Sequence, residues 1–102
     1  NDYGYERLFA RQIEAIGHAG DILFAISTSG RSPNILNAVR VAREKGLVTV
    51  GLTGRGGGEL SALCDHCLRT PSDSTPRIQE GHIAIGHTIC CLIEQQLFPR
   101  TP

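Results

Sequence analysis

Hydrophobic and polar positions follow two different rhythms along the chain, and each rhythm predicts a kind of secondary structure. Apolar side chains recur at helical spacing between residues 3 and 17, and Gly17 suits the end of that helix. Residues 22–26, with the sequence ILFAI, form an apolar run that does not alternate. A run of this kind is typical of a strand buried on both faces of a parallel sheet.

The two rhythms then repeat to the end of the chain. Pro33 suits the first turn of a second helix, which continues to residue 45 and ends at Gly46. Beyond it the pattern predicts a strand at 47–52, a glycine-rich flexible loop at 53–58, a short helix at 59–63, a short strand at 67–69, a loop at 70–76 and a long helix at 77–97.

This order of elements predicts the fold class. Helices and strands that alternate with this regularity indicate an α/β fold, a parallel sheet with flanking helices. The 102 residues suffice for one domain at most. Three strands are few for such a sheet, and the chain starts at Asn1 and contains no methionine. We therefore expect a piece of a longer protein, whose other strands lie upstream of Asn1 or in another chain.

Charge and composition argue against several classes of function. Ten basic residues balance ten acidic ones, so the chain lacks the positive excess that is typical of nucleic-acid binding. No apolar run approaches the roughly 20 residues that cross a bilayer, and the polar start NDYGYERLF is unlike a signal peptide. We expect a cytoplasmic protein with no membrane partner and no direct nucleic-acid partner.

Two of the four cysteines have a spacing that is found in zinc and redox sites. Cys64 and Cys67 form a CxxC motif, but a structural zinc site needs a second pair of ligands. The motif also precedes a predicted strand, whereas a redox-active CxxC usually opens a helix. We interpret this pair as half-buried thiols, and expect them and Cys90 and Cys91 to be reduced.

The turn after the first predicted strand carries the strongest candidate chemistry. Its sequence, AISTSGRSPNIL, brings together the hydroxyls of Ser27, Thr28, Ser29 and Ser32 around Gly30. Ligands of open α/β sheets bind at the carboxyl ends of strands, and the N-terminus of the next helix favours an anion there. The stretch therefore predicts a phosphate site. The alternative is an ordinary serine-rich helix cap, with one capping hydroxyl and the others in solvent.

The long helix at 77–97 offers a second candidate. Gln79 and His87 fall within one broad stripe of this helix, opposite an apolar side. The residues alone leave open whether His87 is a half-buried structural histidine or a chemical group. We interpret His82, at the edge of the stripe, as structural or solvent-facing.

Four segments together resemble the sugar isomerase (SIS) domain family, and they cover nearly all of the chain: NDYGYERLFARQIEAIG, GDILFAISTSGRSPNIL, REKGLVTVGLTGRGGG and RIQEGHIAIGHTIC. The resemblance implies the SIS-type, flavodoxin-like three-layer sandwich with a five-stranded parallel sheet. Residues 1–102 would form the C-terminal portion of a single SIS domain. The resemblance also implies a homotetramer with active sites at subunit interfaces.

The resemblance further implies an activity, the isomerisation of sedoheptulose 7-phosphate to D-glycero-D-manno-heptose 7-phosphate. This reaction supplies the ADP-heptose of the lipopolysaccharide core. A proton moves between C1 and C2 through an enediol, which requires a base, an acid and stabilisation of the developing charge. One of the two proton shuttles of the family would lie upstream of Asn1, so this chain alone is expected to be inactive.

Roles for individual residues follow only from the family pattern. The implied contacts to substrate and phosphate are Asp2, Ser27, Thr28, Ser29, Ser32 and Gln79. The implied catalytic residues are His87 and Gln79, which are also the zinc ligands in members that bind zinc, together with a His and a Glu from an upstream helix. Pro76 departs from the pattern, because some members carry a substrate-contacting aspartate there.

Geometry places a condition on these roles. Gln79 and His87 are eight residues apart, roughly 12 Å along a straight helix. Both can meet one metal ion only through long reach, a bent helix or donation from different subunits.

Two other functions remain open at the level of the sequence. One is a non-catalytic regulatory member of the family that associates with the replication initiator DnaA, which the segments GHAGDILFAIST and QQLFPRTP also resemble. Such a protein lacks the histidine at position 87, so the presence of His87 favours the enzyme. The other is a sugar-phosphate-sensing domain, which would require a DNA-binding segment beyond the ends of this chain.

Overall fold

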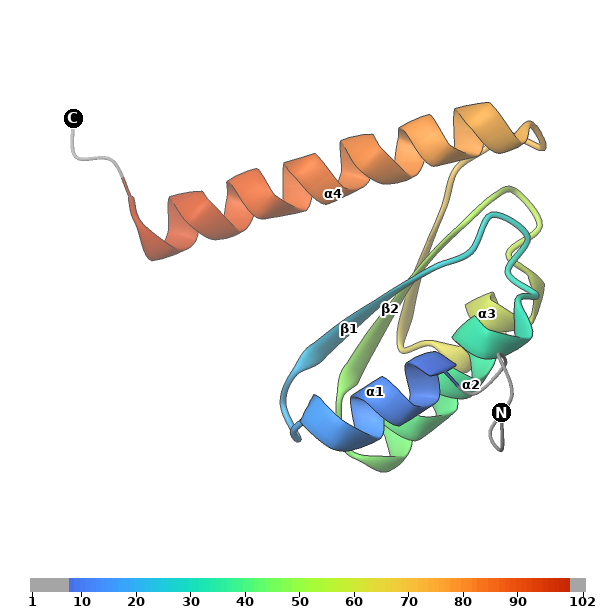
Figure 1. The fold of residues 1–102 in the computed structure, drawn as a ribbon. Coiled ribbons are helices and arrows are strands. Elements are labelled where there is room, and N and C mark those ends of the chain that lie inside the picture. Colours follow the sequence, from blue (N-terminus) through green and yellow to red (C-terminus); the bar gives the residue numbers. More distant parts are fainter. Residues whose placement is uncertain (1–7, 100–102) are drawn as a thin grey trace.

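The computed structural model describes residues 8–99, and its elements follow the predicted order (Figure 1). In chain order they are α1 (Leu8–Ile16), β1 (Ile22–Ile26), α2 (Pro33–Glu44), β2 (Val48–Thr53), α3 (Gly58–Leu63), β3 (His66–Arg69) and α4 (Thr75–Leu97). These bounds agree with the prediction to within one or two residues. The predicted start of the first helix, at residue 3, lies outside the described residues.

The three strands form one parallel sheet with β2 in the centre. In its register Ala25 lies beside Gly51, and Gly51 lies beside Cys67. Because the strands are parallel, the segments that follow them all leave the sheet at the same edge. The predicted α/β class with a parallel sheet and flanking helices is therefore confirmed.

Helices α2 and α3 cover the same face of the sheet. Both crossovers advance from β1 towards β3, and right-handed connections in one direction put their helices on one face. The core on this face consists of two clusters of buried side chains, namely Ile13, Ala38, Ala42 and Leu47, and Ala25, Leu36, Val39 and Leu60. The first cluster joins α1 to α2, so α1 is attached mainly through α2.

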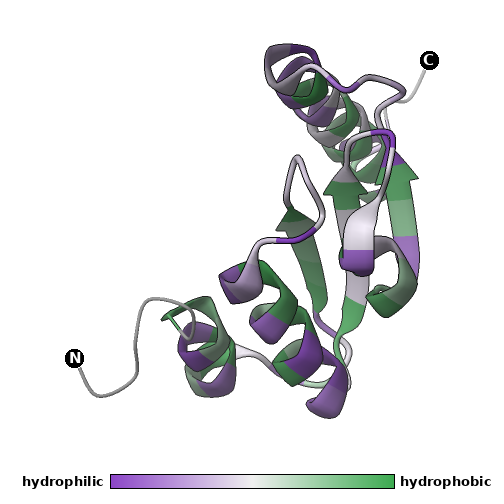
Figure 2. Cartoon of the chain, turned by 90° about the vertical axis from the view of Figure 1, so that its right-hand side faces the viewer, coloured by the Kyte–Doolittle hydropathy of each residue, from purple (hydrophilic) through white to green (hydrophobic). Residues whose placement is uncertain are grey.

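The prediction that residues 22–26 are buried on both faces is wrong for the described chain. Ala25 is buried against α2, but Ile22, Phe24 and Ile26 are 58%, 41% and 52% exposed. Val48 and Leu68, which belong to the same face of the sheet in this register, are also exposed. The cause is the one-sided arrangement of helices: α2 and α3 cover one face, and no described helix covers Ile22, Phe24 and Ile26 on the other. Figure 2 shows how much of the three strands is hydrophobic.

Helix α4 extends well beyond the rest of the chain. Figure 1 shows it passing above the carboxyl end of the sheet and continuing past β1. Ile78 and His82 are its buried residues, whereas its exposed large apolar side chains are Ile83, Leu92, Ile93 and Leu97. Exposed apolar surface is thus found on both the sheet and α4, which agrees with the expectation that further strands lie outside this chain.

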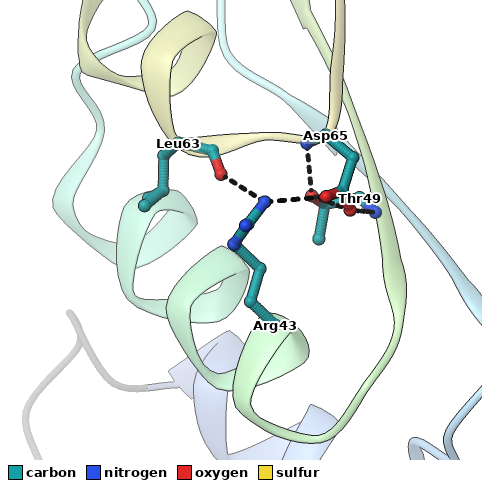
Figure 3. Close-up of polar contacts among 4 residues, drawn as sticks. All are labelled: Arg43, Thr49, Leu63 and Asp65. Carbon is teal, nitrogen blue, oxygen red and sulfur yellow. Dashed lines mark hydrogen bonds and ion pairs between the residues drawn. The ribbon is translucent and has the colours of Figure 1, made fainter.

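A small polar network ties the amino end of β2 to its neighbours (Figure 3). The Asp65 carboxylate accepts hydrogen bonds from the backbone N–H of Thr49 at 2.8 Å and from its hydroxyl at 3.0 Å. The backbone N–H of Asp65 in turn donates to Thr49 Oγ1 at 2.9 Å. Arg43 of α2 donates to Asp65 Oδ1 at 2.9 Å and to the Leu63 carbonyl at 3.0 Å. One carboxylate therefore joins α2, β2 and the segment between α3 and β3.

We predict that Asp65→Asn destabilises the fold in a pH-dependent way. The hydrogen bonds from Thr49, aided by Arg43, hold the pKa of Asp65 below its ordinary value of 3.8. A carboxylate with a lowered pKa stabilises the folded state above its ordinary pKa, and this contribution is lost as the pH falls through the lowered one. Denaturant unfolding of the whole protein should show a difference between parent and variant at pH 7 that shrinks below about pH 4.

Glu59→Gln is the matched control, because Glu59 forms only a solvent-exposed pair with Arg40, at 3.7 Å. Its unfolding midpoint should stay close to the parent's at both pH values. An Asp65→Asn protein as stable as the parent at pH 7 would contradict the role of this network.

Candidate functional site

A polar cleft of about 300 Å³ lies at the carboxyl edge of the sheet. The three segments that follow β1, β2 and β3 all contribute to it, as does the first turn of α4. Its lining residues are Thr28, Ser29, Arg31, Gly54, Arg55, Gly56, Ser72, Asp73, Thr75 and Ile78. The location agrees with the rule that ligands of open α/β sheets bind outside the carboxyl ends of the strands.

The four predicted hydroxyls divide into two pairs. Thr28 and Ser29 line the cleft. Ser27 is buried, accepts the N–H of Gly30 at 3.0 Å, and lies 3.0 Å from the hydroxyl of Ser32. Ser27 and Ser32 therefore shape the turn in this structure, while Thr28 and Ser29 face the space where a ligand fits.

The alternative of an ordinary helix cap is not what the structure shows. Ser32 is the N-cap residue of α2, but its side chain makes no capping hydrogen bond. Ser29 accepts the N–H of Arg31 at 3.1 Å through its oxygen, which leaves its O–H proton to donate elsewhere. The serines thus build a compact turn at the N-terminus of α2, where the helix dipole favours an anion.

The glycine-rich loop is more than a flexible connection. Gly30 has φ +71° and Gly58 has φ +57°, a region that glycine adopts readily. A Cβ on Gly58 would lie only 2.6 Å from the carbonyl oxygens of Ser29 and Gly30. The Gly30 carbonyl accepts the N–H of Leu60 at 3.0 Å. Two backbones therefore meet directly, and this contact fixes the hydroxyl turn against the start of α3.

Charged residues in the cleft were missed by reasoning from the sequence. Arg31 follows the hydroxyl turn, and Arg55 donates to the Pro71 carbonyl at 3.0 Å and lies 3.7 Å from Asp73. All three line the cleft. The sequence signal that could have found them is their position. Residues 54–56 and 72–75 follow strands that end at the same edge of the sheet as β1. Two guanidinium groups add positive charge beside Thr28 and Ser29, which suits an anionic ligand.

The residues that were predicted on α4 lie outside this cleft. Gln79 and His87 are both exposed, and neither lines it, although Ile78 beside Gln79 does. The helix is unbroken from Thr75 to Leu97, so a bend does not bring them together. Gln79 and His87 could still meet one metal ion in two ways. Their side chains could reach it from one helix, or two subunits could each donate one of them. Asp2, the other predicted contact, lies outside the described residues.

The described residues do not assemble a metal site. Among residues 8–99 no group of three or more His, Cys, Asp or Glu side chains is placed to hold an ion. Cys64 and Cys67 are half-buried free thiols, as predicted, and burial raises the pKa of the Cys64 thiol. A raised pKa disfavours the thiolate, which is the nucleophilic and metal-binding form.

The fold and cleft together define a sugar isomerase type of domain, and comparison with known proteins agrees. Residues 1–54 match the SIS domain family, and the chain belongs to that family. It is 56% identical over 98 residues to the phosphoheptose isomerase of Aneurinibacillus thermoaerophilus and 58% identical over 98 residues to that of Sulfurimonas denitrificans. Each alignment covers 96% of this chain and 50% of the relative.

Solved structures show the same likeness. The phosphoheptose isomerase of Neisseria gonorrhoeae superposes with a TM-score of 0.88 at 45% identity, over 91% of this chain and 53% of that one. The chain thus spans about half the length of the proteins it matches. No helix in the described part of the chain is long and apolar enough to cross a membrane.

We predict that Gly58→Ala disrupts the cleft by separating the two backbones that form it. The added Cβ would collide with the carbonyls of Ser29 and Gly30, and the positive φ adds strain. Together these effects should cost more than about 1 kcal/mol of folding free energy, measured by denaturant unfolding of the whole protein.

Gly56→Ala is the control in the same loop, because a Cβ at Gly56 meets nothing within 4 Å. This variant should unfold at the parent's midpoint. Equal stability of the Gly58→Ala variant and the parent would contradict the close contact of the two turns.

Proposed function

We propose that the whole protein containing this chain is a phosphosugar isomerase that interconverts sedoheptulose 7-phosphate and D-glycero-D-manno-heptose 7-phosphate. The observation that carries the proposal is the hydroxyl-lined cleft at the N-terminus of α2, in a chain 56% identical to phosphoheptose isomerases. The product would supply the heptose of lipopolysaccharide, and the reaction would take place in the cytoplasm.

The phosphate of the sugar binds at the hydroxyl turn in this proposal. Thr28 and Ser29 donate hydrogen bonds, and the N-terminus of α2 and the guanidinium of Arg31 supply positive potential. Ser27 and Ser32 hold the turn in shape through their mutual hydrogen bond, so that Thr28 and Ser29 face the phosphate. Binding at this remote group positions C1 and C2 of the sugar for proton transfer.

Proton transfer belongs to the residues of α4 and to a part of the protein outside this chain. Imidazole exchanges protons near neutral pH, so His87 suits one shuttle between C1 and C2. The Gln79 amide donates to the oxygens that become the enediol and stabilises their developing charge. His87 is exposed and does not line the cleft of its own chain, so in this proposal it acts in the cleft of another subunit.

A homotetramer would satisfy two features of this chain. It would bring α4 of one subunit to the cleft of another, and it would cover part of the exposed apolar surface of α4. Zinc remains a proposal for the assembled protein only, since residues 8–99 of one subunit do not gather a ligand set. Gln79 and His87 would be two of its ligands, and bound zinc would polarise the sugar oxygens.

The regulatory alternative, association with DnaA, has weaker support. The relatives reported above are named isomerases, and His87 is present. Among the described residues we find no observation that favours it over the enzyme.

We predict that Ser29→Ala weakens substrate binding. Loss of one charge-assisted hydrogen bond should raise KM for sedoheptulose 7-phosphate by about tenfold, which corresponds to about 1.4 kcal/mol. Thr88→Ala is the control, because the Thr88 hydroxyl only returns to the carbonyl of Ala84 on α4. Unchanged KM in Ser27→Ala, Ser29→Ala and Ser32→Ala variants would remove this turn as the phosphate site.

We predict that His87→Asn lowers kcat by at least about 10²-fold in an intact oligomer. His66→Asn is the matched control, since His66 lies at the start of β3, at the opposite edge of the sheet from the cleft. Metal content, measured on the same samples, separates the two roles of His87. Loss of zinc identifies a ligand, and retained zinc with lost turnover identifies a proton shuttle. A fully active His87→Asn oligomer would contradict the proposal.

A further inference from the structure

His82 is the buried polar contact between α4 and the sheet. Its ring is 4% exposed, and its Nε2 lies 2.9 Å from the carbonyl oxygen of Thr53, the last residue of β2. Ile78, one turn earlier, is the other buried residue of α4 and forms part of the cleft wall. The remaining turns of the helix extend away from the body of the chain (Figure 1).

The Thr53 carbonyl receives two hydrogen bonds at this point. The N–H of Thr70, the residue after β3, donates to it at 2.9 Å, and His82 Nε2 approaches to the same distance. A carbonyl oxygen only accepts hydrogen bonds, so Nε2 must carry the proton. The ring therefore donates through Nε2, and Nδ1 has no hydrogen-bond partner among residues 8–99.

The backbone around His82 is shaped to permit this approach. A Cβ on the preceding residue, Gly81, would lie 2.5 Å from the Thr70 hydroxyl oxygen. A side chain there would push α4 away from the end of β3. Gly81 and His82 together bring the helix against the carboxyl ends of β2 and β3, which are two of the three strands that lead into the cleft.

We propose that His82 is a positioning residue for the isomerase reaction. It sets the place of the first turns of α4, and with them Ile78 and Thr75 in the cleft wall and the neighbouring Gln79. The role is a structural one, because Nε2 bonds to a backbone carbonyl and the ring is buried. The inference rests on the proposed function for its kinetic consequence, but not for its structural one.

The expected kinetic consequence of displacing α4 is that kcat falls while KM changes little. The hydroxyl turn is held by its own contacts, from Gly30 to Leu60 and from Ser27 to Ser32, and none of them involves α4. Displacing α4 should therefore disturb Gln79 and the reacting end of the sugar more than the phosphate. Misplacement of a catalytic group by about 1 Å can cost about 10²-fold in rate.

The test compares His82→Gln with His82→Asn in the whole protein. The glutamine amide is long enough to donate to the Thr53 carbonyl in place of Nε2, whereas the asparagine amide is one methylene shorter. We expect His82→Asn to lower kcat at least about tenfold with KM within about twofold, and His82→Gln to restore most of the rate. Equal rates for both variants, or a rise in KM without loss of kcat, would overturn the proposal.

A stability control separates positioning from mere destabilisation. Val39, fully buried on α2, lies in the core away from α4, so Val39→Ala lowers the melting temperature without moving the helix. Its kcat per folded protein should equal the parent's. A fall in kcat that matches that of His82→Asn would overturn the proposal.

A measurement that needs no turnover distinguishes this inference from the proposed function. Long-range ¹H–¹⁵N spectra of histidine-labelled parent protein should show one imidazole locked as the Nε2–H tautomer, and that signal should vanish in His82→Gln. An Nδ1–H tautomer for His82, with Nε2 unprotonated, would overturn the positioning role, because such a ring cannot donate to the Thr53 carbonyl. Absent turnover in a parent protein that shows the predicted tautomer would refute the isomerase function and leave the anchoring of α4 intact.

Discussion

The direct contact between two backbones, at Gly30 and Gly58, is the constraint on which the cleft depends. The turn after β1 and the loop after β2 can meet only because neither position carries a side chain. Their meeting brings Thr28, Ser29 and Arg55 into the lining of one cleft. A close backbone approach is rigid because no rotamer change can relieve it. The position of the polar groups is therefore set by the main chain rather than by long side chains.

The cleft and the open apolar face have the same origin in the topology. Two consecutive crossovers in one direction place α2 and α3 on one face and bring the ends of all three strands to one edge. That arrangement concentrates the segments that carry polar side chains, but it leaves Ile22, Phe24 and Ile26 without cover. Large exposed apolar patches mark surfaces that bind other protein in the native assembly. The polar cleft and the open apolar face are thus two results of one strand order.

The order of elements could be read from the sequence because each buried face leaves a local pattern. The apolar run at 22–26, Pro33 and the glycines at 17 and 46 predict a strand and helix ends without any knowledge of distant contacts. Burial could not be read in the same way. An apolar run predicts that a strand prefers burial, but whether a layer covers it depends on the rest of the assembly.

The site was predictable in type but not in its full composition. Thr28 and Ser29 stand out because four hydroxyls follow one strand. Arg31, Arg55 and Asp73 carry no such signal, since an isolated charge in a loop is ordinarily solvated. His82 shows the opposite case. Its spacing on the helix places it at the edge of a polar stripe, and only the tertiary contact with the Thr53 carbonyl reveals that it is buried.

The one-sided attachment of α4 makes this helix a lever. From His82 to Leu97 it extends about 22 Å beyond its last buried anchor. A rotation of about 10° at that anchor moves the far end by about 4 Å, given the same helix geometry. The position of Leu97 therefore depends strongly on the angle at which α4 is held at His82. Whatever packs against the far turns of α4 in the assembled protein must therefore match an angle that is set at the cleft wall, about five turns away.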